Sequence, residues 1–219
     1  MLFRSEQSDD QLRAFSLPTR PDRERAPIAF TNWQRALGPS IRYIETASYS
    51  ASVAAFRSFS ALGRVAATTD SSRNWSGAVV ARAGAEQIVL AQGAWTVPIA
   101  NAGRMPPAPV GGLWKSSIWI GLDGYLPASR SMPQIGIEQL IADMPGGART
   151  HRAWLWWWSL GEKPELPLYM DQVPITPGDE IYAQILVLDP FTVNMLLANL
   201  SRGIGAAYTV SASTFQGPG

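Results

Sequence analysis

From residue 74 onward the chain consists of short apolar or alternating runs separated by glycine, proline, asparagine and aspartate. Runs of this length predict β-strands, and the separators are residues that tight turns require. Because no convincing helical pattern lies between the runs, we expect an antiparallel β-sandwich or barrel. The predicted strands are Ser76–Ala81, Gln87–Val97, Ser117–Leu122, Gln134–Ile141, Arg152–Leu160, Glu180–Leu188, Val193–Leu200 and Ala206–Ser213.

A shift in composition divides the chain into an N-terminal extension, residues 1–72, and the predicted sandwich, residues 73–219. The extension has nine arginines, seven acidic residues and one tryptophan, whereas residues 74–219 hold eight tryptophans. Apolar residues that recur from Val53 to Val65 predict one weakly amphipathic helix in the extension. We expect a partly disordered or helical leader. The alternative is a propeptide that covers an active-site groove.

The chemistry open to this chain is limited by its composition. It has no cysteine, which excludes disulfides, thiolate nucleophiles and zinc-thiolate sites. It has one histidine, His151, which excludes a polyhistidine metal centre. A Ser-His-Asp triad would need His151, but no nucleophile-elbow pattern occurs in the sequence. We therefore expect no metal and no cofactor, and chemistry carried out by carboxylates, amides or hydroxyls.

The charge pattern also restricts the partners. A formal net charge of +1, with 16% charged residues, gives no basis for electrostatic capture of nucleic acid or of an anionic membrane. No apolar run is long enough to span a membrane. Charged residues from Arg4 to Asp10 interrupt the N-terminus, so we recognise no secretory signal there. We expect a monomer.

Large aromatic residues gather in one predicted strand. Since alternate residues of a strand share a face, Trp154, Trp156 and Trp158 should lie on one face, with Leu155 and Trp157 on the other. Both faces cannot belong to the same core. We therefore expect one set of rings on an outer face, where an apolar groove would suit a peptide or polysaccharide.

Several motifs follow one another in a specific order. They are NWSGAVV (74–80), AWTVP (94–98), SIWIGLDG (117–124), PQIGIEQ (133–139), AWLWWW (153–158) and ITPGDEIYAQI (175–185). Together they resemble the glutamic peptidases, also called eqolisins, over essentially everything after residue 73. The resemblance implies a sandwich of two antiparallel sheets of the lectin type, and an acid-acting endopeptidase that uses a glutamate and a glutamine.

The same resemblance assigns roles to individual residues. Gln134 matches the catalytic glutamine, whose amide would donate a hydrogen bond to the oxyanion of a tetrahedral intermediate. Asp123 matches the aspartate of the family motif, and Trp75 and Trp119 match tryptophans that border the active site. With Trp154 and Trp156 these residues are the predicted substrate-binding set, and the ligand would be a polypeptide.

Two positions depart from the family pattern. The family's catalytic glutamate, the general base, lies on a strand after the segment that resembles residues 196–203, and no such strand is found before Gly219. We therefore expect a C-terminal truncation, and loss of the general base would leave the chain inactive. In addition, Trp156 stands where the family usually has a glutamate. Glu138 is a candidate substitute, but four residues place it about 13 Å from Gln134 along the strand. Glu162 and Glu165 follow in a turn that we expect to be solvated.

Two functions remain open from the sequence. The leading one is an acid endopeptidase of the glutamic type. The alternative is a non-catalytic β-sandwich that binds peptide or glycan on its tryptophan face. The resemblance implies secretion, whereas the N-terminus gives no sign of it, so the location is unknown from the sequence.

Overall fold

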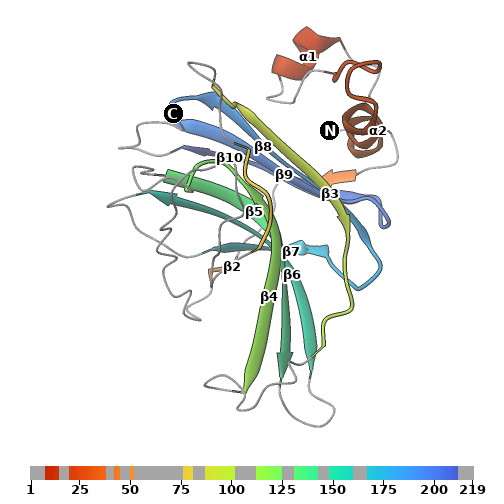
Figure 1. Ribbon diagram of the computed structural model, residues 1–219, viewed down its shortest axis with the longest axis vertical. Helices are drawn as coiled ribbons and strands as arrows, with labels where there is room; N and C mark the ends of the chain where they lie inside the picture. The colour runs from red at the N-terminus through yellow and green to blue at the C-terminus, as the bar shows by residue number, and fades with distance from the viewer. Residues whose placement is uncertain are drawn as a thin grey trace.

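In the computed structural model, the described residues are 8–14, 20–37, 42–44, 50–51, 76–80, 87–101, 112–124, 131–142, 148–159 and 167–211. These residues form two helices and two five-stranded sheets (Figure 1). Sheet A has the strand order β1 (Arg42–Ile44), β10 (Ile204–Ser211), β9 (Thr192–Asn199), β8 (Glu180–Asp189) and β3 (Leu90–Thr96). Sheet B has the order β2 (Ser50–Ala51), β7 (Leu168–Pro174), β6 (Arg149–Ser159), β5 (Ser131–Ala142) and β4 (Leu113–Gly121).

The two sheets pack face to face, which confirms the predicted all-β sandwich. The pairs between neighbouring strands are antiparallel, except that the short β1 runs parallel to β10. Apolar residues at alternate positions of both sheets meet in one core, because every second side chain of a strand points to the same face. Fully buried members include Ile135 and Ile137 on β5, and Ile181, Ile185 and Met195 on sheet A.

The outer face of sheet A is covered by the two helices α1 (Asp9–Ala14) and α2 (Pro27–Ala36). Figure 1 shows both helices on the side of sheet A that faces away from sheet B. Leu12 of α1, and Trp33 and Leu37 at α2, are buried against apolar residues of β8 and β9. A part of the N-terminal extension is therefore packed onto the sandwich.

Local sequence explains where these helices begin. Ser8 and Gln11 form a reciprocal capping box before α1: the Gln11 backbone N–H donates to Ser8 Oγ, and the Ser8 N–H donates to Gln11 Oε1. Pro27 lies in the first turn of α2, where its missing N–H costs nothing. Arg35 lies in the last turn, where a cation is favourable to the helix dipole, and it forms an ion pair with Glu180 of β8.

One predicted strand is wrong, one strand was missed, and one predicted helix lies outside the described residues. The strand predicted at Ser76–Ala81 is wrong for residues 76–80, which are described but form no strand; Val80 is 82% exposed, so the run buries no face. Strand β7 was not predicted because its sequence, LYMDQVP, alternates irregularly, and its pairing with β6 shifts register. The helix predicted from Val53 to Val65 lies outside the described residues.

The chain passes from sheet B to sheet A through a turn that is fixed by Asp179. Asp179 Oδ2 accepts hydrogen bonds from Thr176, Asn199 and Arg202. Burial acts to raise the pKa of Asp179, but these hydrogen bonds outweigh it, so its pKa lies below the ordinary value. None of the helices in the described part of the chain is long and apolar enough to cross a membrane.

Candidate active site

An aromatic cluster lies on the outer face of sheet B, on the side of that sheet that faces away from the core. Trp154 and Trp156 of β6 and Tyr169 of β7 are its buried members, with exposed fractions of 1%, 4% and 3%. Trp119 of β4 and Met132 of β5 pack against them and are half-buried. The neighbouring residues Leu155 and Trp157 pack instead in the core between the sheets. We call Trp119, Met132, Trp154, Trp156 and Tyr169 the aromatic cluster.

Gln134 lies on β5 within the same face. Its Cα is paired with Gly121 of β4 on one side and with Trp156 of β6 on the other. The Gln134 side chain is 5% exposed, and it makes no hydrogen bond to the described residues. The amide atoms of Gln134 are not among the fully buried, unpartnered polar atoms of the described residues, so water or a ligand can reach them. Gln134 is therefore a polar group that is available to a ligand.

Gly121 makes room for this amide. A Cβ atom at Gly121 would lie 3.1 Å from Cγ of Gln134 and 3.1 Å from the ring of Trp119. Any side chain at this position would therefore press on both. The glycine of the Trp-x-Gly motif allows the glutamine and the indole to lie over the same point of β4.

Gly136 is the next residue of β5 on this face. A Cβ there would lie 2.2 Å from the carbonyl oxygen of Ile118 and 2.7 Å from Cα of Trp119, both in the backbone of β4. Strands β4 and β5 can approach this closely only because residue 136 has no side chain. The glycine of the Gln-x-Gly motif is therefore required by the close packing of β5 against β4.

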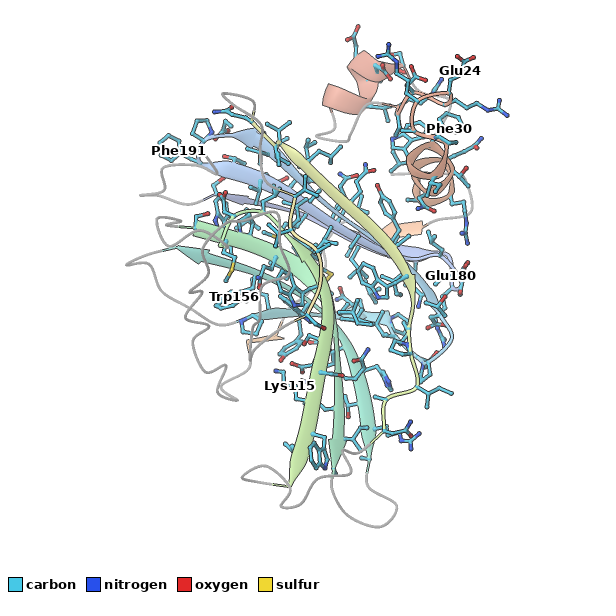
Figure 2. All side chains as sticks on the ribbon, in the orientation of Figure 1. Glu24, Phe30, Lys115, Trp156, Glu180 and Phe191 are labelled. Atoms are coloured by element: carbon cyan, nitrogen blue, oxygen red, sulfur yellow. The ribbon has the colours of Figure 1, made fainter. Side chains whose placement is uncertain are left out.

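A charged group follows Gly136 on the same face. Glu138 is 1% exposed, and its carboxylate forms an ion pair with Lys115 of β4. The Tyr169 hydroxyl donates to both carboxylate oxygens, at 3.1 and 3.3 Å. The guanidinium carbon of Arg152 lies 5.0 Å from the centre of the Tyr169 ring. In Figure 2, Lys115 and Trp156 mark two levels along the strands of sheet B.

His151 lies on the opposite face of β6, because the odd-numbered residues of this strand face the core side of the sheet. Burial, followed by the nearby charge of Arg149, lowers the pKa of His151. It makes no hydrogen bond to a serine or an aspartate among the described residues. The alternative of a Ser-His-Asp triad gains no support from this geometry. Among all the residues that the structure describes, no group of three acidic or histidine side chains could hold a metal ion.

Comparison with protein families identifies the chain. Residues 73–218 match the family model described as Peptidase A4 family. The chain belongs to the Peptidase A4 family. It matches none of the curated proteins with which we compared it.

Several solved structures resemble this chain at low sequence identity. Scytalido-glutamic peptidase with a transition state analog inhibitor is 19% identical, with a TM-score of 0.46 over 59% of this chain and 55% of that one. SCP-B, a member of the eqolisin family in complex with the tripeptide Ala-Ile-His, is 19% identical, with a TM-score of 0.42 over 59% and 52% of the two chains. The chain thus spans about half the length of these structures.

Four residues that the sequence assigned to the site of this Peptidase A4 member come together on sheet B: Gln134, Trp119, Trp154 and Trp156. Asp123 lies two residues after Gly121, in an exposed turn where its φ is +59°. Trp75 lies outside the described residues, and so does the side chain of Trp158. The open groove expected over the tryptophan face is not what the structure has, because Trp154 and Trp156 are buried.

Sequence reasoning missed three residues of this face: Lys115, Arg152 and Tyr169. The position of Arg152 on this face could have been predicted, since it alternates with Trp154 and Trp156 in a predicted strand. Lys115 lies before the predicted start of its strand, which was Ser117, and Tyr169 belongs to the strand that was not predicted. Neither position carries a local signal for the contact it makes.

Proposed function

We propose that this Peptidase A4 member acts on polypeptides at the outer face of sheet B, as an acid endopeptidase in which Gln134 stabilises the oxyanion. The observation that carries the proposal is the buried amide of Gln134, which lies between Gly121 and Trp156 without a hydrogen bond to the described residues. Trp119 and Met132, the half-buried members of the aromatic cluster, offer apolar surface to the side chains of a peptide.

The chemistry follows from the amide. Its N–H groups would donate to the carbonyl oxygen of the scissile peptide bond, and these hydrogen bonds strengthen as negative charge develops on that oxygen. Because Gln134 is almost fully removed from water, the donors need little reorganisation during the reaction. A carboxylate would deprotonate the attacking water and later protonate the leaving amine.

We assign the general base to neither Glu138 nor Asp123. Glu138 is held by Lys115 and by the Tyr169 hydroxyl, so its lone pairs are directed to these partners. Asp123 lies in an exposed turn. Trp156, the Cα partner of Gln134, stands where the family resemblance predicts a glutamate.

Because Lys115 and Tyr169 occupy the carboxylate of Glu138, a second candidate function is a sandwich that binds peptide without cleaving it. The two candidate functions differ in whether the bound peptide is cleaved. Incubation of a denatured protein at acidic pH, with mass spectrometry of the products, should show new peptide ends under the first candidate. Intact protein that nevertheless binds to the chain would support the second.

The direct test of Gln134 is its replacement by alanine. Loss of one oxyanion donor typically lowers kcat by about 100- to 1000-fold, so we expect Gln134→Ala to lose cleavage at acidic pH. Cleavage by the parent chain should resist chelators and reagents for serine and cysteine nucleophiles. Unchanged cleavage by Gln134→Ala would overturn the role that we propose for this residue.

We also propose that residues 73–219 form the peptidase-like unit and that residues 1–72 are an extension of it, which adds the short edge strands β1 and β2 to the two sheets. The described helices of this extension pack on sheet A, whereas Gln134 lies on the outer face of sheet B. Helices α1 and α2 therefore do not cover Gln134.

A further inference from the structure

The outer face of strands β4, β5 and β6 carries one more cation than its carboxylate can neutralise. On β4, β5 and β6 the charged side chains of this face are Lys115, Glu138 and Arg152, which are two cations and one anion. Lys115 forms the ion pair with Glu138, and Tyr169 donates its hydroxyl to the same carboxylate. Arg152 makes no ion pair with any described residue, although Glu138 is its Cα partner across the strands.

The position of the Arg152 guanidinium is set by packing. Its carbon lies 5.0 Å from the centre of the Tyr169 ring, and Tyr169 is fixed in turn by its hydrogen bonds to Glu138. A guanidinium on an aromatic face loses little of its capacity to donate, because its N–H groups point outward in the plane of the group. Arg152 is exposed, so these donors are accessible to a ligand.

We propose that Arg152 is a specificity-determining residue that binds a carboxylate of the peptide held at Gln134. This inference rests on the proposed function. Arginine is suited to this ligand because its planar fork matches a carboxylate with two parallel hydrogen bonds. The partner is thus an extended polypeptide that carries either an acidic side chain or its own C-terminal carboxylate at this point.

The register of sheet B gives the spacing. Arg152 is level with Glu138, and Trp156 is level with Gln134, so four residues of strand separate the two levels. Four residues correspond to about 13 Å, and an extended peptide that follows the strands covers this distance in about four residues of its own. We therefore place the carboxylate about four residues from the peptide bond that contacts Gln134. Between the two levels the peptide passes Gly136, which adds no side chain to the face.

The experiment compares the affinities of matched peptides at pH 6, where a glutamate side chain is ionised. In one set of capped decapeptides a single glutamate is moved through all positions; in the second set glutamine replaces it. Intrinsic tryptophan fluorescence reports binding, and mass spectrometry confirms that each peptide stays intact. A third pair, without acidic residues, has either a free or an amidated C-terminus.

The variants are Arg152→Gln, Arg152→Lys and Arg149→Gln. Arg149 is the matched control, because it removes the same charge from the same strand on the opposite face. We expect glutamate at one position, or the free C-terminus, to bind about fivefold more tightly than its neutral counterpart. Arg152→Gln should abolish this ratio. Arg152→Lys should keep part of the ratio, and Arg149→Gln should keep all of it.

The outcomes distinguish a failure of this inference from a failure of the proposed function. A preference for glutamate that depends on Arg152 identifies a side-chain subsite, and one for the free C-terminus identifies a terminal subsite. Peptides that bind without a preference, or with one that survives Arg152→Gln, overturn this inference and leave the peptide site at Gln134 standing. If no peptide binds, the proposed function and this inference both fail.

Discussion

The two sheets of the sandwich use their outer faces in opposite ways. On sheet A the chain closes the face with its own helices, through Leu12, Trp33 and Leu37 against apolar residues of β8 and β9. On sheet B the outer face combines aromatic rings with Gln134 and with the ion pair of Glu138 and Lys115. Buried polar groups of this kind stabilise a fold less than apolar packing does. We therefore expect sheet A's face to serve stability and, under the proposed function, sheet B's face to carry recognition.

The largest effect should come from the apolar contact on sheet A. Replacing Trp33 with alanine removes a ring that is 1% exposed, which should lower the free energy of unfolding by about 4 kcal/mol. Urea unfolding would measure the loss. Peptide binding by the folded fraction should stay unchanged, because Trp33 is remote from the aromatic cluster of sheet B. A loss of peptide binding without a loss of stability would contradict the roles that we assign to the two faces.

The next effect separates packing from function within sheet B. Gly136→Ala should lower the free energy of unfolding by about 3 kcal/mol, since its Cβ would meet the backbone of β4 at 2.2 Å. Gly121→Ala should cost about 1 kcal/mol, because its contacts at 3.1–3.2 Å need only small shifts. Its main effect should be on peptide binding, through the displaced side chains of Gln134 and Trp119. Equal loss of stability in both variants would contradict this distinction.

Two ion pairs allow the faces to be compared directly. Glu138→Gln breaks the pair that lies within sheet B's face, where the glutamate is 1% exposed, and we expect a loss of about 2 kcal/mol. Glu180→Gln breaks the pair with Arg35 beside α2, where both side chains are nearly half exposed, and should cost less than about 1 kcal/mol. Thermal unfolding of both variants at one ionic strength would rank them. The opposite ranking would mean that Glu138 is better solvated than its burial indicates.

The last effect concerns the turn that joins the sheets, and it depends on pH. The pKa of Asp179 is lowered in the folded state, so its contribution to stability is present above the unfolded value of about 4 and is lost as pH falls further. Asp179→Asn should therefore cost about 1 kcal/mol near neutral pH, with a gap to the parent chain that narrows below pH 4. Unfolding curves between pH 2 and 7 would show it. A gap that is constant over this range would contradict the lowered pKa.

The sandwich was largely predictable because its central strands are short apolar or alternating runs. In β5, Ile135, Ile137 and Ile141 lie at alternate positions, whereas β9 has a continuous apolar run from Met195 to Ala198, and both patterns are local properties of the sequence. The helices were harder to find, since α1 has only six residues and its capping box is a short signal. The burial of Trp33 depends on strands more than 140 residues away, which no local pattern encodes.

The site was predictable in part for the same reason. Alternation alone places Gln134 and Glu138 on one face of β5, and Trp154 and Trp156 on one face of β6. What brings Trp156 beside Gln134 is the register between the two strands, which depends on the turn that connects them. The contact of Tyr169 with Glu138 further depends on the register shift between β6 and β7, so it could not be read from the sequence.

The most direct test of the account compares two buried glutamines, one on each outer face. Gln134 lies on sheet B, and Gln184, which is 1% exposed, lies on sheet A beside Tyr182. Peptide cleavage at acidic pH, or peptide binding if no cleavage occurs, should be measured for Gln134→Ala and Gln184→Ala. We predict that Gln134→Ala loses the activity, while folded Gln184→Ala keeps it. Retention by Gln134→Ala, or equal loss in both variants, would contradict it.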